Sequence, residues 1–158
     1  MSILVHGQPL PSFCLPKTGG GTISSAELAG RQAVLFFYPK ADTSACTVEA
    51  IAFSNLAQSF AAAKTVLLGI SADTLQKQEK FRKKHELVIP LISDDAHILI
   101  GAFGLWVQKQ LYGRKYMGIE RTTVLVDGKS RIAQIWAKVS VAGHAQEVLA
   151  AAESLGRA

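Results

Sequence analysis

The chain has 158 residues, of which 49% are hydrophobic, and its formal net charge is +5. This length fits one domain over residues 1–158, with enough apolar side chains for a real core. No apolar run approaches the roughly 20 residues of a membrane span, and the first six residues lack the basic region of a signal peptide. Two cysteines make no disulfide framework, so we expect a reducing compartment, the cytoplasm, and no membrane association.

The densest group of positive charges lies in one short segment. It contains Lys80, Arg82, Lys83 and Lys84, with Glu79 and Glu86 beside them. A solvated helix face explains this mixture of signs better than a nucleic-acid patch does, so we expect no nucleic-acid partner. A modest positive field can still draw anionic substrates toward the protein.

The N-terminal part of the chain predicts only short elements. Residues 11–16 begin and end with proline and are typical of an extended segment, and the three glycines at 19–21 predict a turn. Residues 22–23 then pair back as a short strand. A brief helical turn through Leu28 follows, capped by one of the two serines that precede it.

A buried strand followed by a long helix is predicted next. Residues 33–38 form an apolar run, and Pro39 ends it because proline cannot donate to a sheet. Residues 42–44 are Asp-Thr-Ser, all helix N-cap types, and the helix is predicted to end at Lys64. Its apolar stripe comprises Val48, Ala52, Leu56 and Phe60, joined by Ile51 and Phe53. Cys46 therefore lies in the first turn of a helix, just past the end of a strand.

The next stretch repeats the alternation of strand and helix. Residues 65–71 form a second apolar strand, which the spacing predicts to be parallel to the first, with a right-handed crossover. A helix over 74–85 follows, with a short strand inside 87–92. A further helix begins after Asp94 or Asp95, either of which is a suitable cap.

The last third of the chain predicts a hairpin and a helix. Residues 108–117 are mixed and interrupted by glycine, which indicates a loop or irregular strand. Residues 122–126 and 130–136 flank the Asp-Gly pair at 127–128, a hairpin signal. A final helix starts near residue 141 or 143. This order of elements suits a thioredoxin-like α/β sandwich, with a mixed central sheet flanked by helices.

The position of Cys46 indicates chemistry. Open α/β folds place their sites at the C-terminal ends of strands. Unpaired N–H groups and the positive end of a helix favour a thiolate there. The alternative is that Cys46 is a small buried hydrophobic residue, as most free cysteines are. The position of Cys46 favours a reactive thiol, but the alternative of a buried packing residue stays open.

Three further residues, Thr43, Arg121 and Glu49, each allow a structural and a functional interpretation. Thr43 lies one turn before Cys46, so its hydroxyl either caps the helix or contacts a reacting group near the sulfur. Arg121 precedes a strand and, taken alone, is typical of a surface arginine. Glu49 is either a capping-box acid or an ion-pair partner of Arg121, for which Glu120 competes.

A resemblance to a known family joins these residues. Pro39, Thr43 and Cys46 form P-x-x-x-T-x-x-C, which resembles the peroxidatic motif of the peroxiredoxins. The flanking residues 37–40 look like the peroxiredoxin Q subgroup, also called bacterioferritin comigratory protein. Later stretches fit the same subgroup in the same order: Gly69-Ile70-Ser71, Leu91-Ile92-Ser93-Asp94, Phe103-Gly104 and Gly118-Ile119-Glu120-Arg121-Thr122.

The resemblance implies a thiol-dependent peroxidase with the thioredoxin-like fold and no cofactor or metal. Cys46 would reduce hydrogen peroxide or a small alkyl hydroperoxide and become a sulfenic acid. Pro39 would shield the thiolate from water, and the Thr43 hydroxyl would bind the peroxide. Arg121 would favour the thiolate and polarise the peroxide oxygens with its forked donors. Glu49 would orient Arg121.

The chain departs from the family where a second thiol is concerned. Some relatives carry a resolving cysteine five residues after the first, where this chain has Ile51, and others carry it on the next helix, where this chain has none. Cys14 is the remaining thiol, and its apolar neighbours Phe13 and Leu15 suggest a packing role. We therefore expect a one-cysteine cycle, in which a thioredoxin-like protein or a small thiol reduces Cys46, and Cys14 is the weaker alternative.

Other functions remain in competition. A thioredoxin-like thiol–disulfide oxidoreductase is disfavoured because the chain has no C-x-x-C. A non-enzymatic binding module on the same fold is the third possibility. No long arm or tail offers itself for dimerisation, so we expect a monomer. Four histidines are expected to be surface or satisfied core residues: His6, His85, His97 and His144. Trp106 and Trp136 are expected to be packing residues rather than a docking surface.

Overall fold

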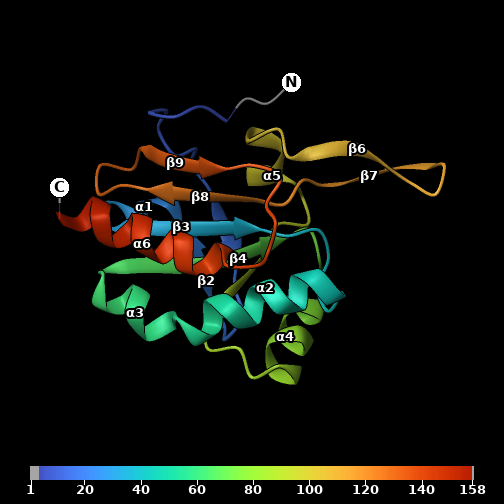
Figure 1. The fold of residues 1–158 in the computed structure, drawn as a ribbon, viewed down its shortest axis with the longest axis horizontal. Helices are drawn as coiled ribbons and strands as arrows, with labels where there is room; N and C mark the ends of the chain where they lie inside the picture. Colours follow the sequence, from blue (N-terminus) through green and yellow to red (C-terminus); the bar gives the residue numbers. More distant parts are fainter. Residues whose placement is uncertain (1–3, 158) are drawn as a thin grey trace.

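A five-stranded mixed sheet organises the structure, a computed structural model that describes residues 4–157 (Figure 1). The strand order is β5-β4-β3-β8-β9. The bounds are β3 Gln32–Phe37, β4 Thr65–Ser71, β5 Leu91–Ser93, β8 Thr122–Val126 and β9 Ile132–Trp136. Strands β3, β4 and β5 run parallel, whereas β8 is antiparallel to β3 and to β9. The predicted mixed sheet is confirmed.

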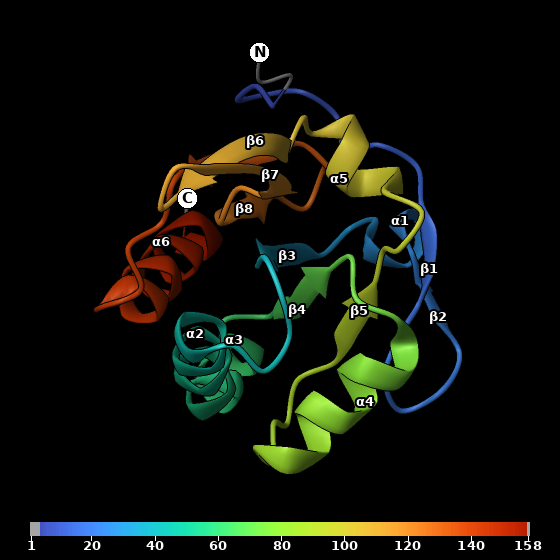
Figure 2. The ribbon, with the colours of Figure 1, turned by 90° about the vertical axis from the view of Figure 1, so that its right-hand side faces the viewer.

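Helices cover both faces of this sheet (Figure 2). Helices α2 Ser44–Asn55, α3 Ala57–Ala62, α4 Leu75–Lys84 and α6 His144–Arg157 pack on one face. The other face carries α1 Ser25–Leu28, α5 Ile98–Ala102 and the small sheet of β1 Cys14–Pro16 with β2 Thr22–Ser24. These layers are those of the thioredoxin-like sandwich that the sequence predicts.

Strand β3 is buried on both sides, which explains its continuous apolar run. Successive side chains point to opposite faces of a sheet. Leu35 and Phe37 therefore enter the cluster under α1 and α5, while Phe36 and Tyr38 enter the cluster under α2, α4 and α6. Each side chain is fully buried. At roughly 1.5–3 kcal/mol for each fully buried large apolar side chain, this strand anchors both layers.

Several predicted helix starts are confirmed by their hydrogen bonds. Ser24 caps α1 through a capping box with Glu27, and Thr74 caps α4. The buried carboxylate of Asp94 accepts the N–H groups of three successive residues at the start of α5, 98 to 100. Such side chains satisfy donors that a helix end leaves without an intrahelical partner.

The apolar stripe predicted for the helix after Cys46 is only partly correct: Phe53 and Phe60 are buried, and Ala52 and Leu56 pack against the core, but two members face solvent. Val48 is 59% exposed and Ile51 36% exposed. The buried positions of α2 instead comprise Cys46, Glu49, Ala50, Phe53 and Ser54. Their spacing of three and four residues faces the sheet, but it includes a carboxylate, which an apolar stripe search passes over. The predicted single helix is also two, because α2 ends at Asn55 and α3 begins at Ala57, with Leu56 between them.

A second hairpin replaces the loop predicted for residues 108–117. Strands β6 Trp106–Leu111 and β7 Arg114–Ile119 pair antiparallel and project beyond the sheet (Figure 1). Tyr112 and Gly113 both have positive φ, as a two-residue hairpin turn requires. Much of the hairpin is exposed on both sides, so its sequence lacks the alternation of a half-buried strand. The hairpin is also an arm of the kind that the monomer prediction assumed to be absent.

The predicted hairpin of β8 and β9 is confirmed, but its turn is longer than two residues. Asp127 accepts the N–H groups of Lys129 and Arg131 through one carboxylate oxygen. Ser130, rather than Gly128, takes the positive φ.

Within the described part of the chain, no helix is long and apolar enough to cross a membrane. The prediction that the first six residues are not a signal peptide concerns residues 1–3 as well, and these lie outside the described residues.

Candidate active site

The sheet brings two distant segments of the chain to the same edge. In the β3–β8 pairing, Phe37 at the end of β3 lies opposite Thr122 at the start of β8. The loop after Phe37 leads to the N-terminus of α2, which carries Cys46, and Arg121 immediately precedes Thr122. A residue on α2 and a residue 75 positions later therefore meet.

Cys46 lies in the first turn of α2 and is 1% exposed. The backbone N–H of Thr47 already donates to the carbonyl of Thr43, at 2.8 Å, so the helix is formed at this point. The helix end places unpaired donors and partial positive charge near the sulfur. Its environment combines this field with near-complete exclusion of water.

Arg121 links the thiol to a buried carboxylate. Its Nη2 donates to Cys46 Sγ at 3.3 Å, and its Nη1 donates to Glu49 Oε1 at 2.7 Å. The structure thus brings together three of the residues singled out from the sequence. Cys46, rather than Glu49, occupies the third helical position of α2, so the capping-box alternative for Glu49 is wrong. Glu120 forms no ion pair with Arg121 among the described residues.

The pKa values of Arg121 and Glu49 are set by two opposing effects: burial, which disfavours each charge, and the attraction between the two side chains, which favours both charges. Burial opposes the charge of Arg121, but Glu49 and Cys46 outweigh it and raise the pKa of the guanidinium. Glu49 is 1% exposed, and burial raises the pKa of its carboxyl to about 7, against the lowering effect of Arg121. Its Oε2 has no hydrogen-bond partner in the described structure. The guanidinium of Arg121 therefore interacts with two acidic groups, the Glu49 carboxyl and the Cys46 thiol.

Thr43 and Pro39 border the same helix start without contacting the sulfur by a hydrogen bond. Thr43 is the N-cap residue by backbone position, but its hydroxyl donates to the carbonyl of Lys40 at 2.7 Å and caps nothing. The side-chain cap predicted as its alternative is therefore wrong. Since a hydroxyl that donates once can still accept, the Thr43 oxygen remains available to a ligand. Pro39 is half-buried in the loop between β3 and α2.

Lys109 is a neighbour that the sequence did not single out. It lies on β6, is half-buried, and its stem passes over Gly118 of β7. Burial and the charge of Arg121 lower its pKa, while Glu120 and Cys46 act in the opposite direction. The hairpin therefore adds a second positive charge to the surroundings of Cys46. The glycine-interrupted sequence around Lys109 predicted a loop and gave no sign of this placement.

The packing role predicted for Cys14 is wrong. Cys14 is exposed, whereas its neighbours Phe13 and Leu15 are buried. This alternation is that of strand β1, whose side chains point alternately to the core and to solvent. Phe13 and Leu15 belong to the cluster on one face of the sheet and Cys46 belongs to the cluster on the other. The sheet thus separates the layer of β1 from the layer of Cys46.

The histidines lie at core or surface positions, as expected, whereas Trp106 is more exposed than its predicted packing role implies. His144 is buried, shares a 2.8 Å hydrogen bond with Thr123, and meets the rings of Phe53 and Trp136 edge-on. Trp106 stacks on His97 but stays 39% exposed. His85 pairs with Asp42, and His6 is exposed. In residues 4–157, no group of three or more His, Cys, Asp or Glu side chains is arranged to hold a metal ion.

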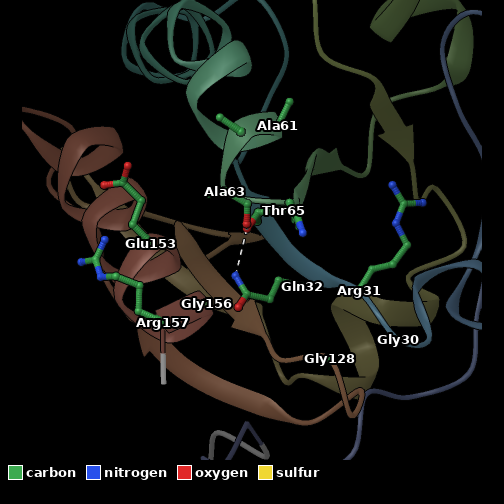
Figure 3. Close-up of a pocket in the computed structure, with 12 residues that line it drawn as sticks. Gly30, Arg31, Gln32, Ala61, Ala63, Thr65, Gly128, Glu153, Gly156 and Arg157 are labelled. Atoms are coloured by element: carbon green, nitrogen blue, oxygen red, sulfur yellow. Dashed lines mark hydrogen bonds between the residues drawn. The ribbon is translucent and has the colours of Figure 1, made fainter.

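A large open pocket lies at the opposite end of the sheet (Figure 3). Its volume is about 930 Å³, and it lies where β3 and β4 begin, beside the end of α6. Gln32 bonds to Thr65 across its floor, while Arg31 and Arg157 lie on opposite sides. No set of polar groups converges there. The cluster around Cys46 is the candidate active site.

Comparison with known proteins agrees with the fold. Residues 6–135 match the family model described as the AhpC/TSA family. The peroxiredoxin Bcp of Bacillus subtilis is 41% identical over 143 residues, covering 90% of this chain and 91% of the relative. A peroxiredoxin Q structure from Xanthomonas campestris has a TM-score of 0.86 and 37% identity, with 91% of each chain covered. A PrxQ mutant from Xylella fastidiosa has a TM-score of 0.92 and 31% identity, with 98% of each chain covered.

The thioredoxin-like fold, the matched family and the peroxiredoxin relatives together define the class as a thiol peroxidase. The chain belongs to the AhpC/TSA family. It is a peroxiredoxin of the Bcp or Q group, which reduces peroxides at the expense of a thiol. The resemblance stated from the sequence is confirmed, and so is the enzymatic function that it implied.

Proposed function

We propose that this peroxiredoxin works as a single domain with Cys46 as its peroxide-reducing thiol. The observation that carries the proposal is the hydrogen bond from Arg121 to the Cys46 sulfur at the start of α2. The thiolate attacks the nearer oxygen of the hydroperoxide, and the O–O bond breaks. The product is a Cys46 sulfenic acid, and the departing oxygen takes a proton to become water or an alcohol.

Arg121 is proposed to stabilise charge at both stages of this step. It keeps its charge at any physiological pH and offers two parallel donors. Before the reaction, Nη2 favours the thiolate, and during the reaction the same fork can shift toward the peroxide oxygens. Glu49 holds the guanidinium by Nη1, which fixes the plane of the fork. Arg121 is thus a catalytic residue and Glu49 a positioning residue.

Thr43 and Pro39 are proposed to shape the entry to the sulfur. The Thr43 oxygen can accept a hydrogen bond from the peroxide while its own proton points to Lys40. Pro39 offers no N–H to solvent and is half-buried beside the helix start, which supports a shielding role. We propose small substrates, hydrogen peroxide and small alkyl hydroperoxides. A Xanthomonas campestris relative supports the second class, since its structures concern alkyl peroxide reduction.

We propose that an external thiol completes the cycle without Cys14. The sulfenic acid reacts with one thiol to give a mixed disulfide and water, and a second thiol releases Cys46 and a symmetrical disulfide. The separation of β1 and Cys46 by the sheet supports this one-cysteine cycle. A monomer suffices, because the thiol, the guanidinium and the carboxylate all come from one chain. We propose the cytoplasm as the compartment.

Peroxide consumption tests the proposal against the other two functions. The purified protein is mixed with hydrogen peroxide or an alkyl hydroperoxide and excess small thiol, and peroxide loss is followed. Catalytic loss supports the peroxidase. Reduction of a protein disulfide without peroxide loss would favour a thiol–disulfide oxidoreductase, and neither reaction would favour a binding module. Sedimentation velocity on the same sample tests the monomer.

A further inference from the structure

A second pocket lies beside the loop that leads to Cys46, and five lysines line it. This lysine pocket has a volume of about 600 Å³. Its lysines are Lys40, Lys77, Lys80, Lys83 and Lys84, and its floor includes Phe81. The chain has 17 lysines and arginines in all, so this one hollow holds a large share of the positive charge. Its volume suits a small molecule.

The acids near this pocket pair with only one of its five lysines. Asp42 is bound to Lys84 and His85, at 2.8 Å each. Asp73 is turned inward, where it accepts from the N–H of Ala41 and the hydroxyl of Ser71. The remaining four lysines form no ion pair within residues 4–157. The lysine pocket therefore has unmatched positive charge.

Helix stability does not account for this placement. Lys83 and Lys84 lie in the last turn of α4, where the helix dipole favours cations. Lys77 lies in its first turn, where the dipole disfavours them. Lys77, Lys80 and Lys84 are spaced three and four residues apart, so like charges adjoin on one face, which destabilises a helix slightly. An anion bound between them would offset both costs.

The lysine pocket adjoins the part of the chain that holds Cys46. Lys40 and Ala41 form one wall, and the carbonyl of Lys40 accepts the Thr43 hydroxyl at the N-cap of α2. Phe81 belongs to the same buried cluster as Cys46. Because Cys46 is 1% exposed, a thiol larger than a peroxide can reach it only when the first turn of α2 opens. That turn follows directly on the loop that forms the wall of the pocket.

We propose that the lysine pocket binds the carboxylates of a low-molecular-weight thiol and delivers its sulfur to oxidised Cys46. The inference rests on the one-cysteine cycle proposed above and names the class of its reductant. The thiol sulfur attacks the sulfenic sulfur of Cys46, the S–O bond breaks, and water leaves. A second molecule of the same thiol then reduces the mixed disulfide, so two thiols become one disulfide per peroxide.

The test separates the two halves of the cycle and compares thiols of different charge. The variant Lys77→Gln with Lys80→Gln removes two pocket charges, and Lys115→Gln with Lys129→Gln removes two exposed charges elsewhere as a control. Each protein is oxidised with one equivalent of hydrogen peroxide. Its reduction is then followed by stopped flow with mercaptosuccinate, which has two carboxylates, and with neutral 2-mercaptoethanol.

We expect the pocket variant to be reduced about tenfold more slowly by mercaptosuccinate, since the variant loses two ion pairs with the carboxylates. Reduction by 2-mercaptoethanol, the control variant and the reaction with peroxide should stay within about twofold. Equal slowing with both thiols, or no slowing with mercaptosuccinate, would overturn the inference. A protein that fails to react with peroxide at all would instead contradict the peroxidase proposal.

Discussion

Arg121 donates to the sulfur of Cys46 across 3.3 Å while its other terminal nitrogen holds Glu49. The two acidic groups compete for a single cation in a site with little water. Because burial raises the pKa of Glu49 to about 7, the carboxyl is partly neutral at physiological pH. The Arg121 charge is then available to the thiolate. Glu49 can keep Arg121 oriented in either protonation state, since a neutral carboxyl oxygen still accepts.

Replacing Arg121 by alanine should slow the reaction with peroxide by roughly 2–4 kcal/mol of barrier, the usual size of a lost oxyanion donor. Arg121→Lys keeps the charge but loses the fork, so it should recover only part of the rate. Stopped-flow peroxide reaction at pH 7 measures both. A wild-type rate in Arg121→Ala would contradict the catalytic role, provided circular dichroism shows the variant folded. Slower alkylation of Cys46 at pH 7 is expected in the same variant.

Glu49 should make the stability of the fold depend on pH. Its pKa is about 7 in the folded state against 4.5 for the free carboxyl, so the folded state binds the proton more tightly. The stability that this proton contributes is present below pH 4.5 and is lost as the pH rises through 7. The loss amounts to at most about 3 kcal/mol, at 1.36 kcal/mol per pKa unit.

Glu49→Gln removes this titration while preserving an acceptor for Arg121. Urea unfolding at pH 5 and pH 8 measures the free energy of unfolding of both proteins. The variant should gain stability relative to wild type between these two pH values. Parallel curves for the two proteins would show that the raised pKa is wrong. Peroxidase activity should fall less in Glu49→Gln than in Glu49→Ala, because only the second loses the acceptor that orients Arg121.

Thr43→Val should slow the reaction with peroxide while leaving the reduction step unchanged. The substitution keeps the shape of the side chain and removes the oxygen proposed to bind the peroxide. Thr47→Val is the matched control, because its hydroxyl also donates to a backbone carbonyl, that of Thr43, at 2.7 Å. Single-turnover rates at several peroxide concentrations give the comparison. Equal slowing in both variants would assign the effect to the helix start rather than to the hydroxyl.

The sequence predicted the elements around Cys46 because local signals agree there. The apolar run, the proline and the N-cap residues mark the end of β3 and the start of α2 within a few positions. The place of Arg121 depends instead on the pairing of β3 with β8, which is a long-range fact. Only the family pattern indicated that Arg121 approaches the sulfur. The 3.3 Å contact then follows from the fold.

The errors have physical causes. The buried face of α2 contains a carboxylate, and its solvent face contains Val48 and Ile51, so hydrophobic periodicity placed these two residues on the wrong side. The exposed hairpin of β6 and β7 buries neither face, so its strands lack the alternation of apolar and polar residues that predicts a strand. Its turn also uses Tyr112, which is 96% exposed, instead of a common turn residue. Lys109 was missed together with that hairpin. Elements whose burial is unusual are those that sequence patterns describe least well.

Cys14→Ser should turn over at the wild-type rate with saturating small thiol, because Cys14 is exposed on β1 while Cys46 lies on the other side of the sheet. Intact-protein mass spectrometry after one equivalent of peroxide, without reductant, should show the gain of one oxygen. A loss of two hydrogens with a linked peptide containing both cysteines would establish an internal disulfide and overturn the one-cysteine cycle.

Cys46→Ser tests the central claim most directly, with Cys14→Ser as its control for the loss of a thiol. Serine is close to cysteine in size but offers no thiolate, so the fold should persist and the chemistry should stop. Stopped-flow measurement of hydrogen peroxide consumption with excess thiol should give the uncatalysed rate for Cys46→Ser and the wild-type rate for Cys14→Ser. Rapid peroxide consumption by folded Cys46→Ser would contradict the account and assign the reaction to another group.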